Sequence, residues 1–399
     1  MLDVCAGIGA ELVRLAVDPV AGRATRVASV KLPASVQYGW MHPTLPVLYV
    51  ACAQRGNPEQ THACIATVGW TPEGDLTTLF SPVALPSRPI HLSADLQGRT
   101  LYVVFNDPPG ILALQLDPSG RAGDAVGAPV SEGLGVYPHQ VRVSPTRREV
   151  VVVSRGWDAT QGHEPVRGRL TVLSPAEGNG DGPELIRAFD FDGLDGVGSF
   201  QARHLDFHPF LPVIYLVLES QSRLLSLNYV DGEIDEHPHS IESTLADTAT
   251  VAPRQAANAV HVHPNGRAVY VSNRGDATED LVAGLPRPPG WVTPEVPPVF
   301  HSGDNSIAHF AVDPVTGAAT LVGTVPTQGF AARTFGISRH GAYLVTGNMK
   351  PMSVREGETT SVVPASLSIF TIGEAGALTF VAATPVDVGN ATMEWSQLL

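Results

Sequence analysis

The sequence predicts an all-β fold, a seven-bladed β-propeller made of four-stranded blades. Three observations predict it: a repeated strand-turn-strand unit, a second hairpin between successive copies of that unit, and a composition rich in turn residues. The clearest copy covers residues 201–219, where two apolar segments flank the turn His208-Pro209. Alternating apolar residues on both sides of a tight turn are typical of a β-hairpin.

This inner hairpin occurs six times along the chain. The second strand of each copy carries a matching anchor residue, and these are Tyr49, Tyr102, Val151, Tyr215, Tyr270 and Val345. Their separations scatter upward from about fifty residues, as expected when a repeat protein accepts insertions in its loops. Three insertions follow second strands, at residues 157–169, 276–304 and 350–365.

An outer hairpin lies between successive anchors, and it occurs seven times. The outer hairpins span Glu11 to Val27, Ala63 to Leu79, Ile111 to Val126, Leu170 to Ile186, Leu224 to Ile234, Ile307 to Leu321 and Leu367 to Phe380. With Leu2-Asp3-Val4 as the missing inner strand, the chain provides seven four-stranded units. Radial repetition hides sheet edges, so we predict a single propeller over residues 1–399, closed by joining the N- and C-terminal strands.

Composition restricts the classes of partner. Hydrophobic residues make up 43% of the 399 residues and charged residues only 16%, a balance that suits many short buried strands. The net charge of −14 lacks the basic footprint of a nucleic-acid binder. No apolar segment approaches the roughly 18 residues of a membrane span, and no secretory signal pattern is present. We therefore expect a cytoplasmic protein that binds neither nucleic acid nor membrane.

Three cysteines, Cys5, Cys52 and Cys64, are an odd and sparse set, which we interpret as buried small hydrophobic residues. The histidines at positions 42, 208 and 263 share one turn position and are expected to cap turns. Strand alternation turns His204 away from its neighbour Arg203, so we expect its ring to pack between blades. We find no metal-ligand constellation and no phosphate-binding glycine loop, and we expect no cofactor.

Two columns of polar residues mark a candidate site. Five residues before each turn stand Gln37, Arg88, His139, Arg203, Asn258 and Arg333, and four residues after each anchor stand Ala53, Asn106, Arg155, Glu219, Arg274 and Met349, the last preceded by Asn348. The start of the first strand and the end of the second lie side by side at the open end of a hairpin. Both columns should therefore meet at one mouth of the central channel. The expected pairs are His139 with Arg155, Arg203 with Glu219, Asn258 with Arg274 and Arg333 with Asn348.

The charge of these columns indicates an anionic ligand. Several arginines face a single carboxylate, Glu219, and uncompensated positive charge in a concave site is costly unless an anion completes it. The guanidinium fork suits a carboxylate or a phosphate. The three insertions emerge at the same mouth and would wall in a small ligand. The alternative interpretation is that these groups are only ion pairs that satisfy strand ends.

The motifs resemble the seven-bladed propeller lactonase family, which includes bacterial 6-phosphogluconolactonase and fungal 3-carboxy-cis,cis-muconate lactonizing enzyme. The resemblance covers essentially the whole chain, and its most specific segments are Tyr137-Pro138-His139-Gln140, Ala202-Arg203-His204-Leu205, Leu218-Glu219-Ser220, Ser272-Asn273-Arg274-Gly275 and Ala332-Arg333-Thr334-Phe335. It implies a catalytic site at His139, Arg203, Glu219 and Arg274. The chain departs from the family pattern at Met349-Lys350-Pro351, which is followed by an insertion.

The leading hypothesis is hydrolysis of a small anionic sugar lactone. His139 or Glu219 would act as base, Arg203 and Arg274 would hold the substrate and stabilise developing charge, and further substrate contacts would come from Arg155, Arg333, Arg88, Asn258 and Asn348. A cofactor-free cycloisomerase of the carboxymuconate type is the second hypothesis. A non-catalytic propeller that binds an anion or a protein is the third. The sequence does not indicate an oligomeric state.

Overall fold

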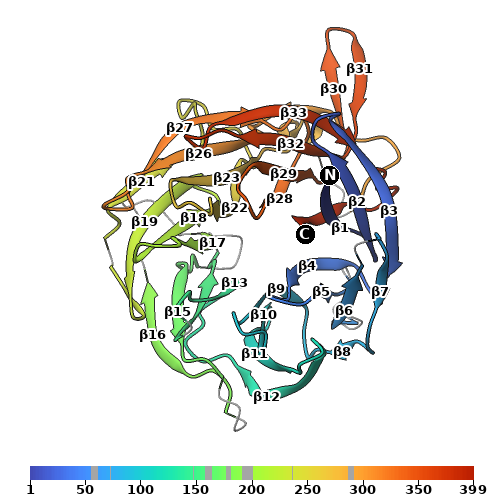
Figure 1. Cartoon of the computed structure of the whole chain (residues 1–399). Helices are drawn as coiled ribbons and strands as arrows, with labels where there is room; N and C mark the ends of the chain where they lie inside the picture. Colours follow the sequence, from blue (N-terminus) through green and yellow to red (C-terminus); the bar gives the residue numbers. More distant parts are fainter. Residues whose placement is uncertain are drawn as a thin grey trace.

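The computed structural model describes residues 1–54, 62–71, 73–146, 148–157, 164–176, 181–190, 201–235, 237–285 and 292–399. In this part of the chain seven sheets of four or five strands stand around a central axis, which confirms the predicted seven-bladed propeller (Figure 1). One short helix, α1 (Glu279–Val282), is present in the same residues. None of the helical structure described is long and apolar enough to cross a bilayer.

The blades follow one another in chain order around the ring, and in each blade the strands are named from the channel outward. Blade 1 contains β34 (Met393–Leu398), β1 (Leu2–Ile8), β2 (Glu11–Asp18) and β3 (Arg23–Lys31). Blade 2 contains β4 (Val36–Met41), β5 (Val47–Cys52), β6 (Cys64–Trp70), β7 (Leu76–Thr78) and β8 (Val83–Ala84). Blade 3 contains β9 (Pro89–Ala94), β10 (Thr100–Asn106), β11 (Pro109–Leu116) and β12 (Ala122–Val130).

The remaining blades repeat this order. Blade 4 contains β13 (Pro138–Val143), β14 (Val150–Ser154), β15 (Arg169–Leu173) and β16 (Leu185–Asp190). Blade 5 contains β17 (Ala202–Phe207), β18 (Val213–Leu218), β19 (Arg223–Val230), β20 (Glu233–Ile234) and β21 (Ser240–Ser243). Blade 6 contains β22 (Ala256–Val262), β23 (Ala268–Arg274), β26 (Ser306–Val312) and β27 (Ala319–Pro326). Blade 7 contains β28 (Ala332–Ile337), β29 (Tyr343–Asn348), β32 (Ser366–Ile372) and β33 (Leu378–Pro385).

The two chain ends join in blade 1, as predicted, but the strand assignment differs from the expectation. Leu2-Asp3-Val4 begins the second strand β1, and the innermost strand is the C-terminal β34, paired antiparallel from Val4↔Leu398. The repeat pattern did not reveal β34 because no turn and second strand follow it in the chain. Trp395 of β34 is buried and packs so closely on β4 that a Cβ at Gly39 would lie 2.6 Å from its ring. The glycine leaves room for this contact between blades 1 and 2.

Three anchor tyrosines of the repeat each hold their blade against the next one. The hydroxyl of Tyr49 in blade 2 donates to the carbonyl of Gly120 in blade 3 at 2.8 Å, and Tyr215 in blade 5 donates to Gly317 in blade 6 at 2.9 Å. Tyr270 makes the same bond to Gly376 in blade 7 at 2.7 Å. These buried bonds satisfy the phenol groups and fix the rotation between neighbouring sheets.

The turn histidines cap their turns, as the sequence predicts. The Nδ1 atom of His208 accepts the backbone N–H groups of Phe210 and Leu211 at 3.0 and 2.8 Å. His42 does the same for Thr44 and Leu45 at 3.2 and 3.0 Å. These rings lie at the turns of the inner hairpins, at the opposite end of the blades from the polar columns.

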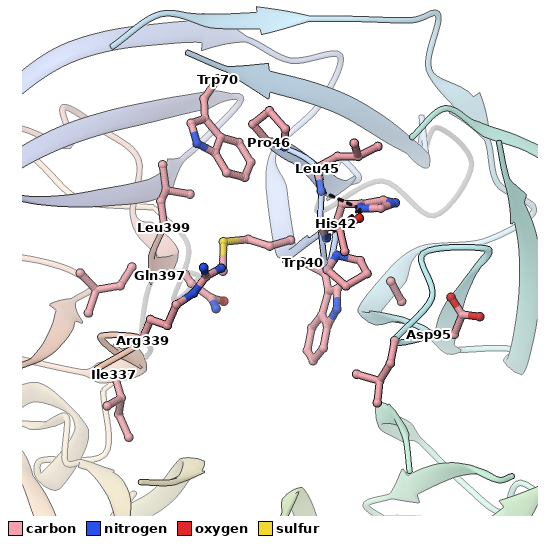
Figure 2. A pocket seen from close by; sticks show the side chains of 16 residues that line it. Trp40, His42, Leu45, Pro46, Trp70, Asp95, Ile337, Arg339, Gln397 and Leu399 are labelled. Atoms are coloured by element: carbon pink, nitrogen blue, oxygen red, sulfur yellow. Dashed lines mark hydrogen bonds between the residues drawn. The ribbon is translucent and has the colours of Figure 1, made fainter. Parts of the chain in front are cut away.

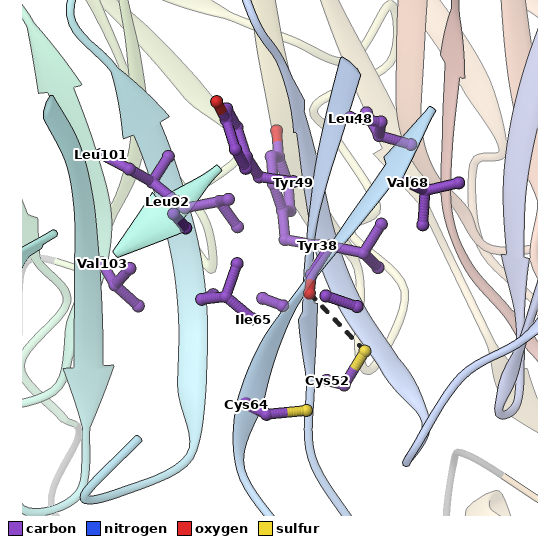
Figure 3. Close-up of a cluster of buried hydrophobic side chains, with 14 of the residues drawn as sticks. Tyr38, Leu48, Tyr49, Cys52, Cys64, Ile65, Val68, Leu92, Leu101 and Val103 are labelled. Atoms are coloured by element: carbon purple, nitrogen blue, oxygen red, sulfur yellow. Dashed lines mark hydrogen bonds between the residues drawn. The ribbon is translucent and has the colours of Figure 1, made fainter. Parts of the chain in front are cut away.

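Apolar side chains fill the spaces between adjacent sheets. Figure 3 shows part of the cluster around blades 2 and 3, where Ile65, Leu92 and Val103 are fully or almost fully shielded from solvent. Cys52 and Cys64 lie opposite each other on β5 and β6 as free, buried thiols. Their surroundings confirm the interpretation of the cysteines as small core residues.

The insertions form small accessory elements. Residues 276–304 carry β24 (Ala277–Thr278), α1 and β25 (Phe300–Ser302), and residues 350–365 form a hairpin of β30 (Met352–Glu356) and β31 (Thr359–Val363) that projects from the ring (Figure 1). The two insertions contact each other, since Arg355 and Glu279 form a bidentate ion pair with both distances 2.9 Å. Of the insertion at 157–169, residues 158–163 lie outside the described part of the chain.

Replacing Trp395 by alanine tests the closure of the ring. We expect the free energy of unfolding, measured by urea denaturation, to fall by about 3–5 kcal/mol because a large buried ring is replaced by a cavity. The matched control is Phe210→Ala, whose ring is 73% exposed and whose loss should change the stability by less than about 1 kcal/mol. Equal effects of the two substitutions would contradict this role of β34.

Candidate functional site

The innermost strand of every blade shifts register at the same place, close to one mouth of the channel. Each shift leaves extra residues on the innermost strand opposite a shorter stretch of its partner, which is the signature of a β-bulge. The residues at these bulges are Glu394, Gln37, Ile90, His139, Arg203 with His204, Asn258 with Ala259, and Arg333. A bulge changes the direction in which its side chains point. Each of the seven innermost strands therefore carries one irregular position, and these positions form a ring near this mouth of the channel.

The bulges explain one error and one omission of the sequence-based prediction. His204 does not pack between blades: its ring lies 5.2 Å from that of His139 and 5.5 Å from that of His91, all three on innermost strands. The expectation assumed strict alternation after Arg203, which the bulge interrupts. Glu394 occupies the same position in blade 1 and was missed because β34 had not been recognised as a copy of the repeat.

These positions surround a cavity of about 420 Å³ at the mouth of the channel. Its lining contains seven cationic side chains and three carboxylates, together with one histidine. The lining residues are Arg88, Ile90, Tyr137, His139, Arg155, Arg203, Glu219, Arg254, Arg274, Asp276, Arg333, Met349, Lys350 and Glu394. The excess of positive charge in this lining agrees with the predicted preference for an anionic ligand.

Glu219 is the electrostatic centre of the cavity. It follows β18 and accepts hydrogen bonds from three guanidinium groups: Arg155 from blade 4, Arg203 from its own blade, and Arg274 from blade 6 at 2.9 Å. Only 5% of its side-chain surface is exposed. The predicted Arg203–Glu219 pair is therefore present, and two further arginines join it from the adjacent blades.

Burial and charge act in opposite directions on these groups. Burial alone would raise the pKa of Glu219, but Arg203, Arg155 and Arg274 lower it to about 2, so the carboxylate is ionised. Burial lowers the pKa of Arg203 to about 10, although Glu219 opposes this effect. With all three arginines protonated, the cluster carries a net positive charge around one carboxylate.

His139 lies beside this cluster as a neutral imidazole. Burial holds its pKa well below the usual value for histidine, and the charges of Arg203, Arg333 and Arg155 lower the pKa further. Its Nδ1 atom is enclosed and has no hydrogen-bond partner among the described residues. The ring lines the cavity, so we expect Nε2 to be the nitrogen that faces a ligand.

The other charged side chains of the lining have partners outside the Glu219 cluster. Arg333 forms an ion pair with Glu394 across the junction of blades 7 and 1. Arg88 donates a hydrogen bond through Nε to the Gln37 side chain at 3.0 Å. On the other side, Asp276 binds Lys350 at 2.8 Å and Arg254 at 3.0 Å. The sequence analysis did not assign Arg254, Asp276, Lys350 or Glu394 to the site. Their positions in loops and in the unrecognised strand gave no signal in the repeat alignment.

Two predicted substrate contacts lie elsewhere. Asn348 is fully buried inside blade 7, where its amide donates to the Ser366 and Ser368 hydroxyls, both at 2.8 Å. Asn258 is also fully buried, and its amide has no hydrogen-bond partner within the described ranges. Neither side chain belongs to the described lining of the cavity, so we do not assign them to the site.

Three expected pairs are not formed. Arg155 binds Glu219 and Gln201 instead of His139, Arg333 binds Glu394 instead of Asn348, and Arg274 binds Glu219 instead of Asn258. Each expected pair combined two residues of the same blade. The long arginine side chains instead reach residues of the neighbouring blade, and strand pairing within a blade does not predict such partners.

A larger cavity, of about 610 Å³, opens where the inner hairpins turn, at the other end of the channel (Figure 2). Most of its lining side chains are apolar, including Trp40, Met41, Trp70 and Leu399. Arg339 is the arginine in its described lining. We place the functional site in the smaller cavity because its lining gathers seven cationic side chains and three carboxylates around His139, whereas the lining of the larger cavity is mostly apolar.

Substitution of Glu219 by glutamine tests its role as the counter-charge of the site. Three closely packed guanidinium groups would then lack their carboxylate, and we expect the free energy of unfolding to fall by about 3–5 kcal/mol in urea denaturation. The control is Glu233→Gln, which breaks an exposed pair with Arg187 and should cost less than about 1 kcal/mol. A Glu219→Gln protein as stable as the control would contradict this electrostatic role.

Comparison with known proteins supports the architecture. The chain matches the family described as "Lactonase, 7-bladed beta-propeller" over residues 4–355. It is 27% identical over 261 residues to a 6-phosphogluconolactonase from Yersinia enterocolitica, covering 63% of this chain and 68% of the relative. It is 26% identical over 267 residues to the 6-phosphogluconolactonase of Photorhabdus laumondii, covering 67% of this chain and 66% of the relative.

The fold is also that of a solved structure, the periplasmic gluconolactonase of Pseudomonas aeruginosa. The two superpose with a TM-score of 0.71 over 98% of each chain, at 19% sequence identity. At that identity the superposition shows a shared fold. The family match extends over most of the chain and includes His139, Arg203, Glu219 and Arg274. This chain therefore belongs to the lactonase family of seven-bladed β-propellers.

Proposed function

We propose that the protein hydrolyses an anionic sugar lactone, of the 6-phosphogluconolactone type, in the cavity around Glu219. One observation carries the proposal: a buried neutral histidine stands beside three guanidinium groups that converge on one ionised carboxylate. Ester hydrolysis needs an acceptor for the proton of water and donors for the developing oxyanion. His139 supplies the first, and the arginines supply the second.

In the first step, water adds to the lactone carbonyl carbon. As the new C–O bond forms, the imidazole of His139 accepts a proton from the water, and the carbonyl oxygen becomes an oxyanion. Arg203, Arg155 and Arg274 donate hydrogen bonds and carry fixed positive charge at that place. Because these groups are already ordered by Glu219, little reorganisation is required when the charge develops.

In the second step the ring opens. The tetrahedral intermediate collapses, the bond between the carbonyl carbon and the ring oxygen breaks, and the leaving alkoxide takes the proton from the His139 imidazolium. The products are an open-chain hydroxyl group and a carboxylic acid, which ionises in water. His139 returns to its neutral form, so no external proton donor is consumed.

Hydrogen bonding favours His139 over Glu219 as the base, because both carboxylate oxygens of Glu219 already accept from guanidinium groups. With its pKa lowered to about 2, Glu219 is a weak proton acceptor near neutral pH. Burial, with positive charge from Arg203 and Arg333, also lowers the pKa of His139 in the empty cavity. A bound anion offsets that charge, so substrate binding raises the basicity of the imidazole. We assign Glu219 the role of positioning the arginines.

Activity assays on two variants test this assignment. We expect His139→Ala to lower kcat for 6-phosphoglucono-δ-lactone by about 10²–10⁴, measured by acid release with a pH indicator after subtraction of spontaneous hydrolysis. The control is His239→Ala, an exposed histidine on the outer part of blade 5, which should retain the wild-type rate. Full turnover by His139→Ala would exclude it as the base.

A parallel ultraviolet assay with 3-carboxymuconate separates the second hypothesis. Cycloisomerisation of a muconate would use the same arginines for its carboxylates. Consumption of the muconate together with inert sugar lactones would contradict the proposed hydrolysis and favour the cycloisomerase. Tight anion binding without turnover of either compound would favour the non-catalytic propeller.

A further inference from the structure

We propose that Lys350 and Arg254, held together by Asp276, form a separate phosphate subsite in the cavity, so that the protein selects phosphorylated over unphosphorylated sugar lactones. This inference rests on the proposed lactone hydrolysis, and it assigns a binding site to the end of the substrate that lies far from the lactone carbonyl. Asp276 and Lys350 begin the insertions at 276–304 and 350–365, and Arg254 lies in the loop before β22, so the three residues come from blades 6 and 7. They line the same cavity as the Glu219 cluster.

Asp276 is fixed by close backbone packing. It lies just after β23, where a Cβ at Gly275 would stand 2.4 Å from the Cα of Gly303. The backbone of Gly275 is also bound on both sides by the Asn305 side chain, at 3.3 and 2.9 Å. With only 12% of its side chain exposed, Asp276 holds its carboxylate at a defined place on the cavity wall.

Lys350 is buried in the cavity, which is unusual for a lysine. It is one of two lysines in the chain, and 9% of its side chain is exposed. The backbone of the preceding Met349 is fixed by hydrogen bonds to Ala331 at 3.4 Å and from Met393 at 2.9 Å. The ammonium group of Lys350 donates to Asp276 at 2.8 Å. The stem is therefore ordered and the cation is placed at the wall.

Arg254 reaches the same carboxylate from the loop before β22. Its backbone has φ of 62°, an uncommon value for a residue other than glycine and one that often accompanies a functional position. Only its Nε atom binds Asp276, at 3.0 Å, and the two terminal nitrogens have no partner in the described residues. The side chain is 53% exposed at the cavity, so this end of the fork is available to a ligand.

The charges of this group favour a phosphate. Two cations share one carboxylate, which leaves a net positive charge, and an anion with several acceptor oxygens bridges a lysine and an arginine well. The group is also distinct from the oxyanion donors, because Arg155, Arg203 and Arg274 are committed to Glu219. A sugar lactone has one carbonyl group. A second anion site in the cavity therefore fits a substituent elsewhere on the ring, such as a terminal phosphate.

The test is the ratio of kcat/KM for 6-phosphoglucono-δ-lactone to kcat/KM for glucono-δ-lactone. Removing one charged hydrogen bond to the phosphate should lower this ratio about tenfold to a hundredfold, both in Lys350→Met and in Arg254→Ala. Lys31→Met, which changes the other lysine of the chain at an exposed position of β3, should leave the ratio at its wild-type value. Equal losses for the two lactones, with an unchanged ratio, would overturn the subsite.

Direct binding keeps this test independent of turnover. If the wild type hydrolyses neither lactone, the proposed function fails, and the subsite is judged by calorimetry with 6-phosphogluconate. Binding by the wild type that weakens at least about tenfold in both variants would support the phosphate subsite. Binding of equal strength in wild type and variants would overturn it.

Discussion

The register shift in each innermost strand is the constraint on which the site depends. A regular strand would alternate its side chains between the two faces of the blade, but a bulge turns extra residues toward the channel. Because the shift recurs in all seven blades, His139, Arg203, Arg333 and Glu394 come to one ring although they are far apart in the chain. The tyrosine hydrogen bonds help to fix the spacing of neighbouring blades at three of the junctions, between blades 2 and 3, 5 and 6, and 6 and 7.

The second requirement is a counter-charge for the arginines. A buried guanidinium such as that of Arg203 and the half-buried ones of Arg155 and Arg274 are unfavourable alone, and Glu219 makes them compatible with a stable fold by accepting hydrogen bonds from all three. This arrangement leaves positive charge that an anionic substrate completes. Asp276 does the same for Lys350 and Arg254 on the adjacent wall. The cavity thus contains two cationic groups, each organised around a carboxylate, with a neutral histidine beside the first.

Much of this could be predicted from the sequence, because the turns, anchors and alternating strands repeat with local signals. Arg203, Glu219 and Arg274 were found since they stand at fixed offsets within hairpins. The partners across blades could not be predicted, because a long side chain such as Arg155 chooses its partner by the spacing of sheets and not by strand register. Asn348 was misplaced for the same reason, since its backbone position is at the mouth while its amide points into blade 7. Glu394 was missed because its strand has no hairpin of its own in the sequence.

The most direct test of this account is a crystal structure of the protein with 6-phosphogluconate, the product of the proposed reaction. We expect the ligand in the cavity around Glu219, with its carboxylate at Arg155, Arg203 and Arg274 close to His139, and its phosphate at Lys350 and Arg254. Such a structure would show that the ring of bulges builds a lactone site. A ligand bound only in the apolar cavity near Trp40 and Arg339, or one that leaves the arginine cluster unoccupied at saturating concentration, would contradict the account.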